Sequence, residues 1–273
     1  MEKAVVTGSF DDLRSHDIRF LEEAARLGIL HVFLWSDELV RSLEGSYPKF
    51  LLEERLYLLQ GIRYVSQVNV VNKFIGQDSI PYPRGHDHVT WVVDEARNNY
   101  QKRIFCASNG VKYHVVKPAS INGFSNKSEG VLEDLSSHKK VVVTGCYDWF
   151  HSGHMRFFEE ASELGDLYVV VGSDENVRLL KGRGHPMLSQ DERRYMVQSV
   201  RFVKQVFISS GSGWMDAEPE IAWIKPDLYV VNEDGDKPEK RGFCETRGIQ
   251  YVVLKRVPKE GLPKRQSTDL RGS

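Results

Sequence analysis

The sequence predicts an α/β fold with two tandem domains, each a parallel sheet flanked by helices. Short β-branched runs alternate with segments whose apolar residues recur at helical spacing, which is typical of a parallel sheet covered on both faces. The two halves also repeat the same segments in the same order. The chain has 273 residues, and at roughly 100–200 residues per domain this length suggests two domains with separate cores.

The second half has the clearer pattern, so its elements are assigned first. Apolar, β-branched runs predict strands at 141–144, 168–172, 205–208, 228–231 and 250–254. Apolar residues at helical spacing predict helices at 155–164, 190–203 and 217–224. Ligands of such sheets bind in the crevice beyond the carboxyl ends of the strands, so we expect the functional site at that edge.

The first half is a degraded copy of the second. Residues 20–24 match 157–161, residues 36–38 match 173–175, and residues 110–113 match 248–251. A match of this length predicts that the halves share one fold. We predict domains at 1–118 and 139–273. The segment 119–138 is rich in Ser, Asn and Gly and shows no clear period, which indicates a linker.

Composition narrows the function to small-molecule chemistry. The net charge of −1 argues against a nucleic-acid groove or a basic membrane-binding face. Three cysteines show no paired spacing, the N-terminus has no signal-peptide pattern, and no apolar stretch approaches the roughly 20 residues that cross a bilayer. We therefore expect a soluble, reduced, cytoplasmic protein that binds neither nucleic acid nor membranes.

The most informative segment runs from Gly145 to His154, directly after the apolar run 141–143. His151 and His154 are three residues apart on a first helical turn, so both imidazoles face the same way, beside free backbone N–H groups and the positive end of the helix dipole. Gly153 lies between them, where phosphate oxygens can approach the backbone. A strand, a glycine turn and this helix start together predict a polyphosphate site.

A histidine pair at this spacing has two other readings, a surface coincidence or half of a metal site. No cysteine or third histidine stands nearby at zinc spacing, so we expect no metal bound by the protein here. The cluster His86-Asp87-His88 is interpreted as a loop, because its repeat partners at 224–226 immediately precede a strand.

These residues resemble the cytidylyltransferase-like nucleotidyltransferases, whose hallmark is the segment G-x-[FY]-D-x-x-H-x-G-H. The match is complete at Gly145, Tyr147, Asp148, His151, Gly153 and His154. The resemblance extends through Lys181-Gly182, Glu192-Arg193 and the near-terminal 267–271, which is similar to the family's second signature, S-[ST]-x-x-R. It covers nearly all of the second half, weakly the first, and implies Rossmann-like domains.

The resemblance implies nucleotidyl transfer, in which a substrate phosphate attacks the α-phosphorus of a nucleoside triphosphate and pyrophosphate leaves. It implies that His151, His154 and Lys181 are the catalytic residues and that Arg193 and Arg256 hold the acceptor phosphate. It also implies Mg²⁺ bound mostly through the triphosphate. The nucleotide-binding residues it implies are Gly145, Cys146, Tyr147, Asp148, Gly153, Asn232, Ser267, Thr268 and Arg271.

Several of these residues have a structural alternative. Lys181 can be a solvated loop lysine, although its repeat partner is Glu44, and a charge reversal in the copy without the histidines fits a phosphate role. Arg193 keeps a partner in Arg55 and can therefore be structural. Asn232 can cap a turn. Arg265 can take the role given to Arg256, because a long segment separates Arg256 from Ser267.

We predict that the first half is not catalytic. His16 is out of register with either histidine, and a Ser-Thr signature is missing after residues 115–118. Family members commonly work as homodimers, so the two copies are expected to form an internal pseudo-dimer through segments 55–65 and 193–203. A homo-oligomer is a further expectation.

The predicted reaction is CMP transfer from CTP to a small phosphorylated acceptor, such as a phospho-alcohol or sugar phosphate, with release of pyrophosphate. One alternative is an adenylyltransferase that uses ATP. The other is a nucleotide-binding regulatory protein without turnover. Residues 191–198 resemble enzymes acting on phosphoethanolamine or glycerol phosphate, whereas residues 173–182 resemble adenylyl-transferring sugar-phosphate members.

Overall fold

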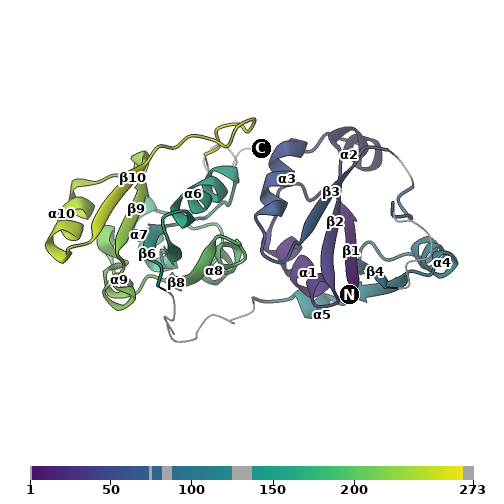
Figure 1. Ribbon diagram of the computed structural model, residues 1–273, viewed down its shortest axis with the longest axis horizontal. Coiled ribbons are helices and arrows are strands. Elements are labelled where there is room, and N and C mark those ends of the chain that lie inside the picture. Colours follow the sequence, from purple (N-terminus) through teal and green to yellow (C-terminus); the bar gives the residue numbers. More distant parts are fainter. Residues whose placement is uncertain (1, 74–75, 82–87, 125–136, 267–273) are drawn as a thin grey trace. The chain divides into compact units, whose positions relative to one another are not determined.

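The computed structural model describes residues 2–73, 76–81, 88–124 and 137–266. The chain divides into two compact units, Met1–Phe124 and Ser125–Ser273. Each unit is an α/β domain with one parallel sheet and helices on both of its faces (Figure 1). The structure thus confirms the α/β fold class of both halves.

The sheet of the first unit has the strand order β3-β2-β1-β4-β5, and all its neighbouring strands are parallel. Its strands are β1 (Lys3–Gly8), β2 (Ile29–Trp35), β3 (Gln67–Val71), β4 (Val89–Asp94) and β5 (Lys112–Val116). Its helices are α1 (Ser15–Ala25), α2 (Asp37–Glu44), α3 (Leu52–Gln60), α4 (Tyr100–Asn109) and α5 (Pro118–Ile121). Helix α5 crosses the predicted start of the linker at residue 119, and it is held to α1 by a 2.6 Å hydrogen bond from Arg19 to the Ser120 carbonyl.

The second unit repeats this topology, with the strand order β8-β7-β6-β9-β10. Its strands are β6 (Lys140–Gly145), β7 (Asp166–Val171), β8 (Val203–Ile208), β9 (Leu228–Asn232) and β10 (Gln250–Leu254). Its α-helices are α6 (Ser152–Ser162), α7 (Asp174–Lys181), α8 (Gln190–Gln198), α9 (Glu218–Ile224) and α10 (Pro238–Arg247), with 3-10 turns η1 (Gly213–Met215) and η2 (Glu233–Gly235).

Four helices of the second unit, α6, α7, α8 and α10, differ from the sequence-based assignment by more than one residue. The helix predicted at 190–203 ends at Gln198, and the chain passes through a turn before β8 begins at Val203. Helix α6 begins at Ser152, three residues before its predicted start. Helices α7 and α10 had no helix prediction, because only Asn176 and Val177 in α7 and only Cys244 in α10 are buried.

Strand β6 lies at the centre of the second sheet, between β7 and β9. Its residues Val141, Val142 and Val143 are fully buried. Burial of a valine side chain stabilises a fold by about 1.5–3 kcal/mol, so this strand is firmly fixed. The turn that follows Gly145 therefore starts from a rigid position in the middle of the carboxyl edge, where parallel α/β sheets bind their ligands.

Candidate functional site

The turn after β6 has a strained but well-anchored backbone. Tyr147 has a φ of 53°, in the left-handed region that non-glycine residues rarely adopt. A Cβ at Gly145 would lie 2.8 Å from the Tyr147 ring, so glycine is required before it. Asp148 is buried, and its Oδ1 accepts hydrogen bonds from the backbone N–H groups of Met187 (2.7 Å) and Leu188 (3.0 Å). This carboxylate ties the turn to the segment that precedes α8.

The turn delivers His151 to the N-cap position of α6. Its Nδ1 accepts a 3.1 Å hydrogen bond from the Gly153 N–H, so the proton of the neutral ring is on Nε2. The imidazole of His154, one turn later, stacks on that of His151 with ring centroids 4.0 Å apart and planes at 21°. The sequence prediction that the two rings lie together is confirmed.

Both histidines are neutral in the folded protein. Burial lowers the pKa of His151 to about 3, and the positive charges of Arg256 and Arg265 act in the same direction. Burial also lowers the pKa of His154 well below its usual value, with further lowering from His151 and Arg256. A neutral imidazole still donates one hydrogen bond, so the pair can contact phosphate without a permanent charge.

Three polar atoms beside the turn are buried and have no hydrogen-bond partner among the described residues. They are Nε2 of His151, Nδ1 of His154 and the hydroxyl of Tyr147. Buried polar groups are nearly always satisfied, so such a group in a native structure calls for an explanation. Three of them within one turn and one helix start give this region hydrogen-bonding capacity that the described residues do not use.

A cleft of about 190 Å³ opens at the carboxyl edge of β6 and β9. It brings together most of the residues that the sequence predicted for the site, from five separate parts of the second unit. Those predicted residues are Gly145, Cys146, Tyr147, Asp148, Gly153, His154, Lys181, Asn232 and Arg256. Two of them, Lys181 and Arg256, carry positive charge into a cleft that the histidine ring borders, so the site suits an anion.

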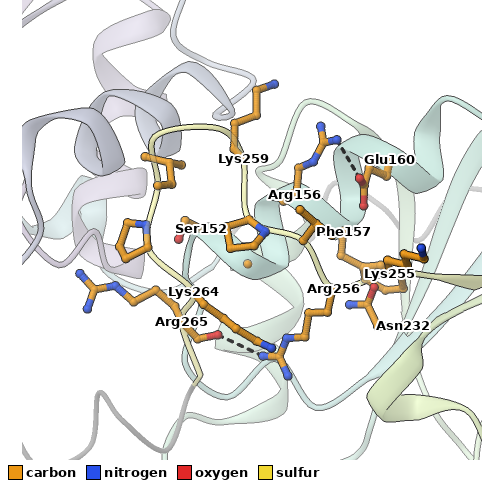
Figure 2. Close-up of a pocket in the computed structure, with 15 residues that line it drawn as sticks. Ser152, Arg156, Phe157, Glu160, Asn232, Lys255, Arg256, Lys259, Lys264 and Arg265 are labelled. Carbon is orange, nitrogen blue, oxygen red and sulfur yellow. Dashed lines mark hydrogen bonds and ion pairs between the residues drawn. The ribbon is translucent and has the colours of Figure 1, made fainter.

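Arg256 is held at the cleft by contacts along the segment 255–265. It forms an ion pair with Asp234. Its Nη2 also donates a 3.1 Å hydrogen bond to the Arg265 carbonyl (Figure 2). The same segment borders a small cavity with Ser152 and Phe157 of α6 (Figure 2). Arg256 therefore lies at the cleft, and its contact with an acceptor phosphate stays a prediction. The predicted residues Ser267, Thr268 and Arg271 lie outside the described residues.

The structure does not bring Arg193 to the cleft. Its side chain is fully buried, and it donates to the Leu188 carbonyl (3.1 Å), the Cys146 carbonyl (2.8 Å) and the Asp174 carboxylate (2.7 Å). Its repeat partner Arg55 makes the same kinds of contact, to the carbonyls of Ser9, Trp35 and Phe50 and to the Asp37 carboxylate. The geometry therefore supports the structural alternative for Arg193, in place of contact with an acceptor phosphate.

Lys240 is a cleft residue that the sequence analysis did not single out. It lines the cleft beside Asn232, its Nζ lies 5.8 Å from the centre of the Tyr229 ring, and burial lowers its pKa. The signal was present in the repeat, because Lys102 occupies the matching position of the first half. It was missed because it lies on α10, for which the sequence analysis predicted no helix.

A cluster of three or more His, Cys, Asp or Glu side chains able to hold a metal ion does not occur within residues 2–73, 76–81, 88–124 and 137–266. Asp148 and Asp234, the acidic residues of the cleft, are occupied by backbone N–H groups and by Arg256. In the same described segments, none of the helices has the length and apolar character needed to span a membrane. Residues 86–87 of the predicted loop His86-Asp87-His88 are outside them.

Comparison with known proteins places the site in a family. The family model described as cytidylyltransferase-like matches residues 142–254. The chain is 41% identical over 146 residues to the bifunctional protein HldE of Campylobacter concisus, a match that covers 48% of this chain but 30% of that protein.

Two similar proteins are covered over most of their length. The chain is 34% identical over 137 residues to the FAD synthase of Aciduliprofundum boonei, which covers 49% of this chain and 85% of that protein. It is 35% identical over 125 residues to the FAD synthase of Ferroglobus placidus, at 45% and 78% coverage. With the fold, the histidine pair and these matches together, the chain belongs to the cytidylyltransferase-like nucleotidyltransferase superfamily.

Proposed function

We propose that the second unit catalyses nucleotidyl transfer from a nucleoside triphosphate to a small phosphorylated acceptor. An oxygen of the acceptor phosphate forms a bond to the α-phosphorus. The bond between that phosphorus and the oxygen bridging to the β-phosphorus breaks, and pyrophosphate leaves with the electron pair. The nucleophile is already an anion, so no general base is needed. The observation that carries this proposal is the stacked pair His151 and His154, in which Nε2 of His151 and Nδ1 of His154 lack partners among the described residues.

His151, Lys181 and Arg256 each have a part in this reaction, although His151 is buried beside the cleft and does not line it. The Nε2–H of His151 is a donor without a partner among the described residues, and it lies at the start of α6, where the helix dipole favours an anion. Lys181 and Arg256 neutralise the triphosphate and the departing pyrophosphate. Donors fixed before the reaction stabilise developing charge without reorganisation, and loss of one such donor typically costs about 10²–10³ in turnover.

Binding of the triphosphate changes the protonation of the pair. The histidines are neutral because they are buried beside cations. A polyphosphate placed against the rings brings negative charge, which favours the protonated form. We propose that His154, whose ring borders the cleft, gains a proton as the nucleotide binds and holds it while pyrophosphate leaves.

Mg²⁺ is proposed as the accompanying cation. The carboxylates of the cleft are occupied by protein donors, so the protein offers few ligands, and triphosphate oxygens and water would hold the ion. When bound, the ion would neutralise part of the triphosphate charge. His151, Lys181 and Arg256 orient the chain of phosphates whether or not the ion contributes.

The nucleotide that we favour is ATP. The relatives covered over 85% and 78% of their length are both named FAD synthase, and formation of FAD joins an adenylyl group to a phosphorylated flavin. CTP is the second candidate, supported by the cytidylyltransferase-like family model over residues 142–254. In both cases the acceptor carries a phosphate that attacks from the side of the cleft bordered by Asn232 and Lys240.

The test is pyrophosphate release by the full chain with ATP or CTP across a panel of phosphorylated alcohols, sugars and flavin mononucleotide. His154→Ala should reduce release at least 100-fold, whereas His16→Ala, an exposed histidine of the first unit, serves as the matched control and should leave it unchanged. Equal loss from both variants contradicts the assignment of the site. Nucleotide binding without pyrophosphate from any acceptor would favour the regulatory alternative.

A further inference from the structure

The first unit contains a larger cavity than the proposed catalytic cleft. It has a volume of about 330 Å³, against about 190 Å³ in the second unit. Small-molecule sites typically occupy about 300–1,000 Å³, so this cavity is of ligand size. It opens at the carboxyl ends of β1, β2 and β4, the edge at which parallel α/β sheets bind ligands.

The two cavities are lined from matching positions of the repeat. Thr7, Phe20 and Lys102 line the cavity of the first unit, and their repeat partners Thr144, Phe157 and Lys240 line the cleft of the second. The turns at their edges also correspond. Phe10 has a φ of 45° where Tyr147 has 53°, and Asp11 accepts backbone N–H groups as Asp148 does. The first unit has thus kept the frame of a ligand site.

The residues that would contact phosphate in the second unit are replaced in the first. Arg14 and Asp17 stand where the second unit has His151 and His154, and the Asp17 carboxylate accepts the Arg14 N–H at 3.0 Å. Glu44 lines the cavity at the position of Lys181, and its carboxylate accepts a 2.8 Å hydrogen bond from the Ser9 hydroxyl. The second place has exchanged a cation for the Glu44 carboxylate, which disfavours a polyphosphate there.

The cavity has also gained an aromatic side chain. Trp35 lines it at the position of Gly172, and the buried Phe20 lines it as well. Gln77 and Arg97 line it too and offer hydrogen-bonding groups around these rings. An aromatic wall with amide and guanidinium groups at its edge is suited to a heteroaromatic base, which stacks by its face and hydrogen-bonds by its edge.

We propose that the cavity of the first unit, bounded by Trp35, Phe20 and Glu44, binds a nucleoside without a polyphosphate. The ligand class rests on the proposed nucleotide site of the second unit, because the matching positions there line the nucleotide cleft. The base stacks on Trp35, and the hydroxyl groups of its sugar face Glu44 and Thr7. The degraded copy is then a sensor of free nucleoside within the enzyme.

The experiment is isothermal titration of the full chain with adenosine, cytidine, ATP and CTP. One nucleoside should bind at a site that Trp35→Leu weakens at least ten-fold. Trp223→Leu is the matched control, because Trp223 is an exposed tryptophan of the second unit that lines neither cavity. It should leave that binding unchanged, as should Lys181→Glu in the catalytic cleft.

A second variant gives a test that does not depend on whether the Trp35→Leu protein folds. Glu44 is exposed, so Glu44→Lys should fold, and it should raise the affinity of this site for triphosphates at least ten-fold. Absence of nucleoside binding, binding insensitive to Trp35→Leu, or equal affinity of the wild-type site for nucleoside and triphosphate would each overturn the inference. Pyrophosphate release by the wild-type chain reports on the second unit separately, so failure of the proposed catalytic function is distinguishable.

Discussion

Replacement of Gly153 by alanine tests whether the position of His151 matters for the reaction. A Cβ at residue 153 would lie 2.9 Å from Cε1 and 3.0 Å from Nδ1 of the His151 ring. Carbon atoms in contact are normally about 3.5–4.0 Å apart, so the ring must move by about 0.5–1 Å. The movement also weakens the hydrogen bond from the Gly153 N–H to Nδ1, which fixes the tautomer.

The magnitudes of the two effects differ widely. Loss of an N-cap hydrogen bond costs about 0.5–2 kcal/mol of stability, whereas alanine in place of glycine in a helix gains up to about 1 kcal/mol. The free energy of unfolding should therefore change by about 1 kcal/mol or less. A displacement of about 1 Å in a catalytic group can cost about 100-fold in rate. We expect Gly153→Ala to fold normally and to lose about 100-fold in turnover.

The assay pairs pyrophosphate release with urea unfolding of the same variant. Gly242→Ala is the matched control, because Gly242 lies in α10 and an added Cβ there meets nothing within 4 Å. It should stabilise the fold slightly and leave turnover unchanged. A Gly153→Ala protein that keeps turnover within two-fold of the wild type would refute the role given to the His151 ring.

Three further predictions follow from burial and charge. Burial depresses the pKa of His154, so below pH 6.5 the unfolded chain binds a proton that the folded chain does not. The free energy of unfolding should therefore fall by about 2 kcal/mol between pH 7 and pH 5 for one such buried histidine. Urea unfolding of His154→Gln should show a shallower dependence on pH. Arg193→Ala should destabilise the fold by roughly 3–5 kcal/mol, as should Arg55→Ala in the first unit, because each removes a fully buried side chain and leaves a partly buried carboxylate and backbone carbonyls unpaired. A wild-type stability with a raised KM for the acceptor would show instead that Arg193 binds its phosphate. Lys181→Met should raise the KM for the triphosphate about 10–100-fold, whereas Glu44→Lys should leave it unchanged in a steady-state assay.

The fold and the centre of the site could be read from the sequence because their signals are local. The motif from Gly145 to His154 specifies a buried strand, a turn and a helix start within one short segment, and the structure has all three. The strand and helix pattern is clearer in the second half, and the matching segments of the repeat allowed the same fold to be predicted for the first half. Both sheets accordingly have the expected parallel arrangement.

What could not be read depends on contacts between distant residues. A charge on a helix has the same appearance in sequence whether it faces a ligand or, as Arg193 does, two carbonyls and a carboxylate from three other segments. The end of α8 was misplaced because the buried Val200 and Val203 extend its apolar spacing beyond its last turn at Gln198. Lys240 lies on α10, in which Cys244 is the only buried residue, and the sequence analysis predicted no helix there.

The most direct test of the central claim is ¹⁵N NMR of the histidine side chains with and without a non-hydrolysable ATP or CTP analogue. In the free protein at neutral pH, His151 should be neutral with its proton on Nε2, and His154 should also be neutral. Saturating nucleotide should shift the ring nitrogens of both residues and move His154 toward the protonated form. Ring signals of His151 and His154 that stay unchanged while the nucleotide is bound would contradict the account.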